Sequence, residues 1–504
     1  MNRTTIILFL CFLLCVNNLT ASSFDKEKLA QALTRYDSFK SFFDGVAVVE
    51  QDEQYGLIDR SGNEIVPCIY DKIEDFGNEF EGLLCVLKNE EYGLIKKATG
   101  KKVTPLIYSE IDDRVEEGFI KVSKGYEKDK FGFVDTTGKE VIPCIYDIAG
   151  YFQEGFVFVG FCIDDKWYCS FIDKTGRNIT PFVYGYNDMN GFSEGLAQVR
   201  RKEVNEDGKS SYKTGFIDKT GKEVIPFIYD DAIDFSEGFA LVGKGGKYAY
   251  INKKGKEITP FIYDRYSRDF IDGMACVHKK TENEYKRDKY GFIDKKGKEV
   301  VPLIYDWAGV YRNGIVAVGK KISINHIYGD KWNCGFIDKK GKVVIPLIYD
   351  AVRTFNETEI LSVEKKGEWA FVNKNGKEIT PFVYNRIYNF VDGLMIPRKA
   401  WNACSIIDKT GKETLLPNCY SSADDSFKEG MAYVVKKDGK IGFIDTTGKE
   451  VIPCIYNAAP YVPFFSDGLA LVEKNGIRGF VDKEGNFIYP GGVEIAKELK
   501  QAVE

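Results

Sequence analysis

A short motif that recurs about a dozen times along the chain constrains its fold more than any other feature. Each copy starts with a glycine, two apolar residues and an aspartate, as in Gly132–Asp135 and Gly291–Asp294. One proline then marks each unit, and the series runs Pro67, Pro105, Pro143, Pro181, Pro226, Pro260, Pro302, Pro346, Pro381, Pro417, Pro453 and Pro490. Repetition with a period of about 20 to 50 residues is typical of solenoids and propellers, whose neighbouring units share one core. The sequence therefore predicts one tandem array of about twelve units.

Each unit is predicted to be a β-meander of about three short strands. Between Ile217 and Lys222, an aspartate and a glycine three residues later are typical of a tight hairpin turn. Alternating apolar residues before each proline indicate a second strand, which the proline is expected to end because it lacks a backbone N–H. A stretch such as Gly195–Val199 indicates the third strand. The predicted fold class is therefore all-β, with every unit stacked on its neighbours.

The array is expected to fill residues 43–491, after an N-terminal lead-in over residues 22–42. Apolar residues at helical spacing between Val493 and Val503 predict a helical cap over residues 492–504. Propeller blades usually have four strands and number about four to eight. Twelve three-stranded units therefore favour an open superhelix or spiral over one or two closed propeller rings.

The first residues have the pattern of a secretory signal peptide, which we expect over residues 1–21. Arg3 precedes a short apolar run from Ile6 to Val16, and small residues follow at Ala21 and Ser22. No later segment is apolar over a length that would span a bilayer, so no membrane insertion is expected once the signal is removed. The mature chain is expected to be secreted, periplasmic or at the cell surface.

The sequence resembles the WG-repeat family, whose units read roughly W/Y-G-F-I-D-x-x-G-K-E-V-I-P-x-x-Y-D and then F-x-E-G-L-A. The match is clear from Tyr290 to Asp306, and residues 43–491 follow the pattern almost throughout. The tryptophan that gives the family its name is mostly replaced, and its position holds Tyr55, Tyr92, Phe131, Cys169, Tyr290 or Cys334. The resemblance implies a β-repeat fold and no particular activity.

Composition and residue spacing argue against several classes of function. The chain has 70 Lys and Arg against 75 Asp and Glu, a net charge of −5, so neither nucleic acid nor an anionic membrane is an expected partner. The periodic acids, such as Asp135 and Glu154, are predicted to serve turns. With His278 and His326 as the only histidines and no zinc-ligand spacing, we expect no catalytic residue, metal site or cofactor.

The cysteines are mostly expected to be buried thiols, because Cys68, Cys144 and Cys454 occupy a position that is apolar in other units. Cys162 and Cys169 flank one hairpin and are the one pair for which a disulfide is considered.

Variation between units is concentrated in one hairpin. The stretch from the third-strand valine to the next glycine is short in Val49–Gly56 but much longer in Val199–Gly215, Val277–Gly291 and Val318–Gly335. Such insertions enter at one place in the unit, and repeat proteins often bind partners through loops of this kind. Both histidines are expected in these loops. The candidate ligand-binding residues are Trp167, Tyr168, Tyr212, Tyr285, His326, Tyr328 and Trp332.

These observations favour an exported, non-enzymatic scaffold that binds a protein or a cell-envelope glycan through the long central hairpins. The competing interpretation of the aromatic residues is that they only pack the loops against the array. Two other functions stay open, a structural or spacer protein without a discrete ligand, and a glycan hydrolase whose acids converge from several repeats. The sequence indicates no oligomeric state.

Overall fold

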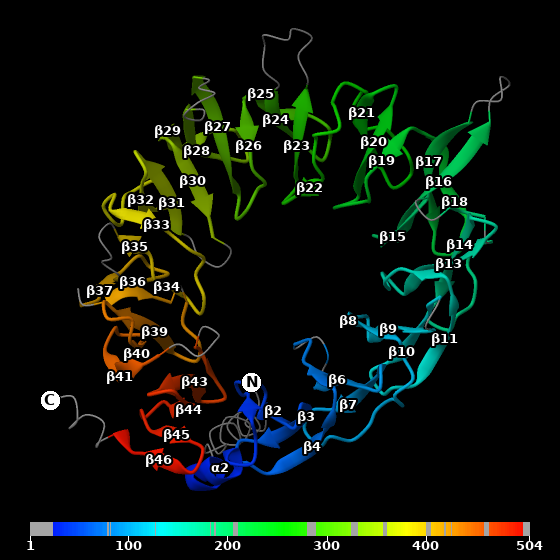
Figure 1. Ribbon diagram of the computed structural model, residues 1–504. Helices are drawn as coiled ribbons and strands as arrows, with labels where there is room; N and C mark the ends of the chain where they lie inside the picture. The colour runs from blue at the N-terminus through cyan, green and yellow to red at the C-terminus, as the bar shows by residue number, and fades with distance from the viewer. Residues whose placement is uncertain are drawn as a thin grey trace, which may run out of the picture.

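The computed structural model describes residues 24–496 except 78–79, 81, 126–127, 182, 186–187, 205–209, 280–288, 324–330, 356–359, 400–404, 418–419, 425 and 458–462. The described chain forms twelve small antiparallel sheets that follow one another around a wide central opening (Figure 1). We number these sheets as blades 1 to 12 in chain order. The predicted all-β tandem array is confirmed.

In the described residues of the first half of the chain, helix α2 (Lys26–Leu33) is followed by blades 1 to 6. Their strands are, for blade 1, β1 (Ser38–Phe39), β2 (Val46–Gln51), β3 (Gln54–Asp59) and β4 (Glu64–Tyr70); for blade 2, β5 (Lys72–Glu74), β6 (Leu83–Lys88) and β7 (Glu91–Lys96); for blade 3, β8 (Glu110–Glu116), β9 (Phe119–Lys124), β10 (Lys130–Asp135) and β11 (Glu140–Tyr146); for blade 4, β12 (Ile148–Ala149), β13 (Phe156–Ile163) and β14 (Lys166–Asp173); for blade 5, β15 (Met189–Ser193), β16 (Leu196–Val204), β17 (Ser210–Asp218) and β18 (Glu223–Tyr229); and for blade 6, β19 (Asp231–Ala232), β20 (Phe239–Lys244) and β21 (Lys247–Asn252).

The second half of the chain forms blades 7 to 12. Their strands are, for blade 7, β22 (Phe270–Ile271), β23 (Met274–Lys279), β24 (Lys289–Asp294) and β25 (Glu299–Tyr305); for blade 8, β26 (Trp307–Ala308), β27 (Ile315–Ser323), β28 (Lys331–Asp338) and β29 (Val343–Tyr349); for blade 9, β30 (Ala351–Thr354), β31 (Ile360–Lys365), β32 (Glu368–Asn373), β33 (Tyr384–Arg386) and β35 (Arg398–Lys399); for blade 10, β34 (Leu394–Met395), β36 (Ser405–Asp408) and β37 (Glu413–Leu415); for blade 11, β38 (Tyr420–Ala423), β39 (Met431–Lys436), β40 (Ile441–Asp445) and β41 (Glu450–Tyr456); and for blade 12, β42 (Phe465–Ser466), β43 (Leu469–Lys474), β44 (Ile477–Asp482), β45 (Phe487–Tyr489) and β46 (Gly492–Glu494).

A typical blade runs from an inner strand at the central opening to an outer strand at the rim. In blade 3 the order is β8, β9, β10 and β11, with β8 inside and β11 outside (Figure 1). The sequence predicted the last three strands of this order. It did not predict the inner strand, because that strand is as short as two residues in β12 and carries no periodicity of its own.

The turn between the third and fourth strands has the predicted geometry. In blade 3 one carboxylate oxygen of Asp135 accepts the backbone N–H groups of Thr137 at 2.9 Å and Lys139 at 3.0 Å. Gly138 then adopts φ +85°, in the left-handed region that favours glycine. The same bonds recur at Asp218, Asp294 and Asp445, so these acids are structural, as predicted.

The outer strand continues through its proline in blades 1, 3, 5, 7, 8 and 11, and there the prediction that proline ends the strand is wrong. In blade 12, β45 ends at Tyr489 directly before Pro490, as predicted. Strand β11 continues through Pro143 to Tyr146, and the register with β10 shifts on both sides of Phe133. The bulge brings the proline strand against Gly132, where a Cβ atom would lie only 2.5 Å from the carbonyl oxygen of Ile142. An outer strand can carry proline because its outward N–H positions need no ladder partner, and proline there discourages edge-to-edge pairing with another chain.

Blades 4, 6 and 9 follow a variant of this arrangement. The glycine is replaced by Ser170, Ala249 and Ala370, respectively. In the same blades a buried threonine before the proline accepts a backbone N–H from the third strand, as Thr180 does from Phe171 at 3.0 Å. The threonine hydroxyl thus replaces part of the backbone hydrogen bonding to the third strand that a continuous outer strand provides in other blades.

Neighbouring blades are joined by a repeated bond that involves the glutamate before the glycine of the second strand. The carboxylate of Glu154 in blade 4 accepts the backbone N–H of Gly195 at 2.8 Å and pairs with Lys219 at 3.1 Å, both in blade 5. The equivalent acids elsewhere are Glu117, Glu194, Glu237, Asp272 and Glu429. The sequence predicted a local role for these acids, but their partners lie in the next blade.

These bonds predict that acid weakens the ring. Partial burial acts to raise the pKa of Glu154, but the ion pair with Lys219 and the N–H of Gly195 outweigh it and lower the pKa below the ordinary value of 4.5. The pKa values of Glu237 and Glu429 are lowered in the same way. Because the folded-state pKa is below the unfolded-state pKa, each carboxylate stabilises the ring fully above the unfolded value and loses its effect as pH falls through the folded value.

We therefore expect the melting temperature to be steady near neutral pH and to fall below about pH 4.5, as measured by scanning calorimetry. The Glu154→Gln variant is expected to have a lower melting temperature than the wild type at pH 7. Its melting temperature is expected to fall less on acidification. The control is Asp113→Asn, at a side chain that is 69% exposed. Equal pH dependence in the wild type and Glu154→Gln would contradict this role.

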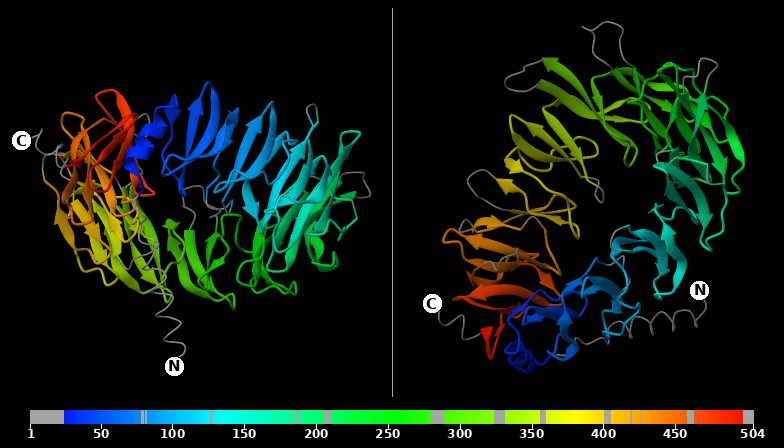
Figure 2. Two further views of the ribbon diagram at one scale, coloured as in Figure 1. Left: turned by 90° about the horizontal axis from the view of Figure 1, so that it is seen from below. Right: turned by 45° about the vertical axis from the view of Figure 1, so that its right-hand side comes forward.

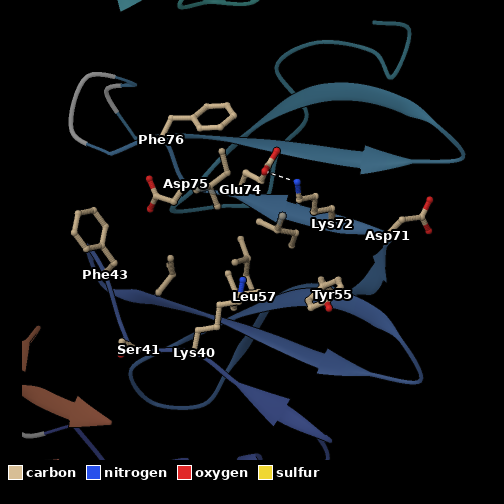
Figure 3. Close-up of a pocket in the computed structure, with 14 residues that line it drawn as sticks. Lys40, Ser41, Phe43, Tyr55, Leu57, Asp71, Lys72, Glu74, Asp75 and Phe76 are labelled. Carbon is tan, nitrogen blue, oxygen red and sulfur yellow. Dashed lines mark ion pairs between the residues drawn. The ribbon is translucent and has the colours of Figure 1, made fainter. Parts of the chain in front are cut away.

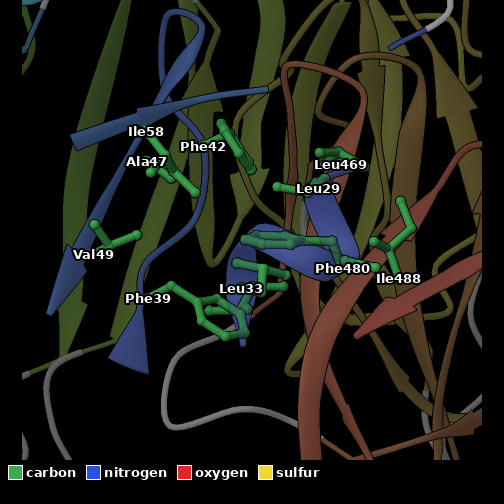
Figure 4. Packing of buried hydrophobic residues seen from close by; sticks show 12 residues of the cluster. Leu29, Leu33, Phe39, Phe42, Ala47, Val49, Ile58, Leu469, Phe480 and Ile488 are labelled. Atoms are coloured by element: carbon green, nitrogen blue, oxygen red, sulfur yellow. The ribbon is translucent and has the colours of Figure 1, made fainter. Parts of the chain in front are cut away.

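The array closes into a ring, which corrects the expectation of an open superhelix. Blade 1 packs on blade 12, and Figure 2 shows the first blade, in blue, beside the last blade, in red. Phe39 and Phe42 lie 5.2 and 5.1 Å from the ring of Phe480, and Leu29 and Leu33 of α2 are fully buried in the same cluster (Figure 4).

The closing contact uses the same bond as the other blade interfaces. Asp467 of blade 12 accepts the backbone N–H of Gly45 in blade 1 at 2.8 Å. Helix α2 reinforces this seam, because the carbonyl of Ala30 accepts the N–H of Gly491 at 2.9 Å and Lys26 pairs with the buried carboxylate of Asp482.

Most of the predicted C-terminal helical cap lies outside the described residues, which end at residue 496. Residues 492–494 form the strand β46, and Ala496 is helical. Helix α2, from the N-terminal lead-in, covers the seam.

Candidate functional site

The longest hairpins connect the second and third strands of four blades in one arc of the ring. They are β13–β14 in blade 4, β16–β17 in blade 5, β23–β24 in blade 7 and β27–β28 in blade 8. In blade 5 the ladder continues to the pair Val204 and Ser210, whereas in blade 9 the equivalent hairpin turns directly after Lys365 and Glu368. The described ladders of blades 4, 5 and 8 therefore extend beyond the hairpin turn of an ordinary blade, while residues 280–288 of the blade 7 hairpin lie outside the described residues.

Three of the predicted binding residues occupy one register position on these hairpins. Trp167, Tyr212 and Trp332 each lie three residues before the glycine or serine of the repeat. They share a strand face with Cys169, Thr214 and Cys334, which are buried. Since Cys169 packs with Met189 and Phe192 of the next blade, this face is directed toward the following blade. The candidates Tyr285, His326 and Tyr328 lie outside the described residues.

The described candidates differ in exposure. Tyr212 is 42% exposed, and the guanidinium of Arg200 lies 5.0 Å from its ring centroid. Tyr168 is also exposed, on the opposite face of its strand from Trp167. Trp167 is half-buried against the core between blades 4 and 5. Tyr212 and Tyr168 thus offer aromatic surface to a partner, while Trp167 also serves packing.

The sequence missed a second tryptophan beside Trp332. Trp307 belongs to the short inner strand β26, pairs with Gly319 and is 38% exposed. It is the second residue after the repeat tyrosine Tyr305, a position that varies widely, as Lys72 and Ile148 show. The sequence signal was present as a lone tryptophan at a variable position, but the strand that places it was not predicted.

His278 does not lie in a loop, contrary to expectation. It is in strand β23, only 2% exposed, and its Nδ1 lies 2.5 Å from a carboxylate oxygen of Asp264. The hydroxyl of Ser267 accepts the backbone N–H of His278 at 3.0 Å. A histidine–carboxylate pair is a familiar catalytic element, but burial at this depth gives substrate no access to the imidazole.

The cysteines are free thiols in the described part of the chain. Cys162 is opposite Trp167 and Cys169 is opposite Gly160, so the two cysteines are diagonal neighbours. Diagonal positions are about 7 to 8 Å apart, too far for the disulfide that the sequence left open. Burial raises the pKa of Cys85 and Cys276 to about 12, which keeps both thiols protonated.

Two acids near the central opening depart from the repeat pattern. Burial raises the pKa of Asp234 and of Asp269, and the charge of Asp269 raises that of Asp234 further, while a hydrogen bond from Asn190 acts against the shift. Asp234 lies between β19 and β20 of blade 6, Asp269 directly precedes β22 of blade 7, and Asn190 belongs to β15 of blade 5. Within the described residues, no group of three or more His, Cys, Asp or Glu side chains is arranged to hold a metal ion.

A cleft of about 710 Å³ lies between blades 1 and 2. Phe43 and Phe76 line one end, and Tyr55, Asp71 and Lys72 line the other (Figure 3). The stretch from Tyr70 to Gly82 spans 12 positions, whereas the equivalent stretch from Tyr146 to Gly155 spans 9. Residues 71–76 of the longer stretch line the cleft.

Most charges around the cleft are already paired. Lys72 binds Glu74 at 2.5 Å, and this hydrogen bond raises the pKa of Lys72. Lys97, only 4% exposed, bridges Asp75 at 2.7 Å and Asp44 at 2.9 Å. The pair of Lys97 with Asp44 joins blades 1 and 2, so it contributes to the contact between these blades.

The fold and the hairpins together define a class of protein, a closed ring of β-repeat blades with the longest hairpins on one arc. The family model for the WG containing repeat matches residues 55–92, 92–127, 131–167, 170–203, 215–248, 248–280, 290–321, 335–369, 369–396 and 441–476. The chain belongs to the WG containing repeat family, which confirms the resemblance seen in the sequence. No curated protein sequence matches it.

Solved structures show only distant likeness. A eukaryotic initiation factor has 12% identity and a TM-score of 0.33, with 66% of this chain and 94% of that chain covered. BamB from Moraxella catarrhalis has 9% identity and a TM-score of 0.24, with 57% and 90% covered. Apo AztD from Citrobacter koseri has 10% identity and a TM-score of 0.25, with 73% and 89% covered.

Proposed function

We propose that the chain is an exported, non-enzymatic scaffold that binds a protein or a cell-envelope glycan through the long hairpins of blades 4, 5, 7 and 8. One observation carries the proposal. Trp167, Tyr212 and Trp332 occupy the same register on three hairpins, while the short hairpins place turn residues such as Gly246 and Gly367 there. Large aromatic side chains on protruding loops suit recognition, because they bury much area at little conformational cost.

The use of the periodic acids supports the same proposal. Glu154, Glu194 and Glu237 each bind a glycine N–H and a lysine of the next blade, so they hold the ring together. Acids that are used in these contacts between blades are not available for catalysis. The long hairpins are then the variable part of an otherwise regular structure. Within the described residues, no helix is both long and apolar enough to cross a membrane.

Two alternatives have distinct expectations. A spacer protein would bind no ligand and would tolerate every hairpin change. A glycan hydrolase would use Asp234 and Asp269 as its acids, because their raised pKa values suit proton transfer. Shortened products after incubation with envelope glycans, lost in Asp234→Asn, would favour the hydrolase over the scaffold.

The proposal is tested by trimming the hairpins. In one variant residues 201–213 are replaced by Asn-Gly between Arg200 and Thr214, and in a second the remaining long hairpins are shortened as well. We expect the first variant to keep nearly the same melting temperature, because the described residues it removes are exposed or half-buried. We expect ligand retention on an envelope-glycan array and in pull-downs to fall sharply in the first variant and to disappear in the second.

The matched control replaces Gly245–Gly246, the short turn of blade 6 in the same arc, by Asn-Gly. Only a ligand that the wild type and this control retain counts as specific. If the same ligand is still retained after all long hairpins are trimmed, the binding surface is elsewhere and the proposal is wrong. If the wild type retains neither glycan nor protein, the spacer alternative replaces it.

A further inference from the structure

One face of the long hairpin in blade 5 carries two cations and an aromatic ring. Leu196 and Phe216 belong to this face and pack against blade 6. Because alternate residues of a strand share a face, Arg200, Lys202 and Tyr212 are on the same side, closer to the tip of the hairpin. The part of the hairpin that is directed toward blade 6 is therefore basic.

The facing wall of blade 6 carries two more cations. Val242 and Ile251 pack against blade 5, and Lys244 and Lys247 share their face of β20 and β21. The two lysines are directly opposite each other on either side of the turn, an arrangement in which like charges destabilise a hairpin. An anion bound between the two walls would relieve this repulsion.

These four cations have no carboxylate partner in the described parts of the chain. The acids close to them in the sequence are mostly on other faces. Glu223 pairs at 3.3 Å with Arg201, which is on the opposite face of the hairpin, and Glu203 belongs to that face too. Asp231 is on the far face of blade 6, where it accepts the hydroxyl of Tyr248 at 2.9 Å.

Two acids do belong to the interface between blades 5 and 6. One carboxylate oxygen of Asp230 binds Lys213 at 2.5 Å, and the other accepts the backbone N–H of Gly245 at 2.6 Å. This ion pair is neutral as a whole. Asp234 follows the inner strand of blade 6 and is hydrogen-bonded by Asn190 of the inner strand of blade 5. The groove between the two hairpins therefore has an excess of positive charge.

The guanidinium of Arg200 is held in place without an anion. Its Cζ lies 5.0 Å from the ring centroid of Tyr212, which is 42% exposed. A guanidinium stacked on a ring presents its N–H donors in one plane, which suits two parallel bonds to a carboxylate. In the other long hairpins this position holds Gly160, Gly319 or the buried His278, so blade 5 alone has a cation here.

We propose that the groove between the hairpins of blades 5 and 6 binds a carboxylate-bearing polysaccharide, such as a polyuronate. Arg200 binds one carboxylate, and the exposed ring of Tyr212 stacks on the flat C–H face of the sugar that carries it. The carboxylates of neighbouring sugars are attracted by Lys202, Lys244 and Lys247. This inference rests on the proposed binding function and assigns it a ligand class and a location.

The test titrates the full mature chain with oligogalacturonate, with oligoglutamate of the same number of carboxylates, and with a neutral cello-oligosaccharide. Calorimetry measures the affinity at low and high salt. We expect oligogalacturonate to bind most tightly and to bind more weakly at high salt, because salt screens the lysines. Oligoglutamate is expected to bind more weakly, because it has no ring to stack on Tyr212, and the neutral ligand is expected to bind least.

A matched pair of variants tests the face of the hairpin. Arg200→Gln is expected to weaken oligogalacturonate binding about tenfold, which corresponds to about 1.4 kcal/mol. Arg201→Gln removes the same charge at the next residue, on the opposite face, and is expected to bind like the wild type. The double variant of Lys244→Gln and Lys247→Gln leaves the long hairpin intact and is also expected to weaken binding.

A second pair of variants tests stacking. Tyr212→Ala is expected to reduce the preference for oligogalacturonate over oligoglutamate, whereas Tyr212→Phe keeps the ring and is expected to keep the preference. The melting temperature of each variant, compared with the wild type, shows whether the blade is still folded.

The outcomes distinguish this site from the general proposal. If Arg200→Gln binds oligogalacturonate as tightly as Arg201→Gln does, the site is wrong. Equal affinity of the wild type for oligoglutamate or for the neutral ligand overturns the assignment to an acidic sugar. If the wild type binds no oligogalacturonate but hairpin trimming still removes another ligand, the ligand class is wrong and the scaffold proposal stands. If trimming also has no effect, both are wrong.

Discussion

Aspartate in place of both Leu29 and Leu33 is expected to open the ring between blades 12 and 1. Both leucines have no exposed surface and pack with Phe480 at the seam. A buried, unpaired carboxylate costs several kcal/mol, so the two together are expected to remove more than about 4 kcal/mol from the closing contact. Solution scattering is expected to show a larger radius of gyration, and calorimetry a new transition below the main one.

The other blade interfaces are unchanged in this variant. The stability of a repeat protein is approximately the sum of the stabilities of its units and of the interfaces between neighbouring units. We therefore expect an opened array and not an unfolded chain. The control is Leu415→Asp, which adds a charge at a side chain that is 68% exposed. A double variant with the scattering curve and melting profile of the wild type would show that α2 does not hold the ring closed.

Valine at Gly335 is expected to be the most damaging single substitution in blade 8. A Cβ atom there would lie 2.5 Å from the carbonyl oxygen of Ile345 and 2.7 Å from that of Pro346, and backbone cannot yield as a side chain can. Overpacking of this kind costs about 3 kcal/mol or more, because the third and fourth strands must separate. Denaturant unfolding at constant pH measures the loss.

The matched control for this prediction is in the next blade. Ala370 occupies the position of Gly335 in blade 9, where the threonine Thr380 replaces part of the ladder. Ala370→Gly removes a methyl group and adds chain entropy, so it is expected to cost about 1 kcal/mol. If Gly335→Ala costs no more than Ala370→Gly, the close approach of the proline strand does not explain the glycine.

The sequence was sufficient for the features that depend on a few residues close together in the chain. The turn at Asp135 depends on an acid, a glycine and their spacing, all of which are local, and the structure reproduces it. The long hairpin of blade 5 could likewise be placed from the distance between Val199 and Gly215. The continuation of β11 through Pro143 was missed, because a bulge is a property of two paired strands and not of the proline alone.

Features that depend on the angle between units could not be predicted. Closure depends on the small rotation from each blade to the next, added over the whole array, and no single motif encodes it. The partner of Glu154 is a glycine 41 positions later, so the sequence showed a recurring acid without its contact. Trp307 was missed for a related reason, since its neighbour Gly319 is aligned with it only once the inner strand is known.

The bond between Asp467 and Gly45 is of the same kind as the bond between Glu154 and Gly195. The ring therefore has no privileged starting blade apart from the helix at its seam. A circularly permuted chain, with its natural ends joined across the seam and new ends at an exposed turn such as Asp164–Asp165, would keep every blade interface. The blades could therefore be synthesised from a different starting blade and still occupy the same positions around the central opening.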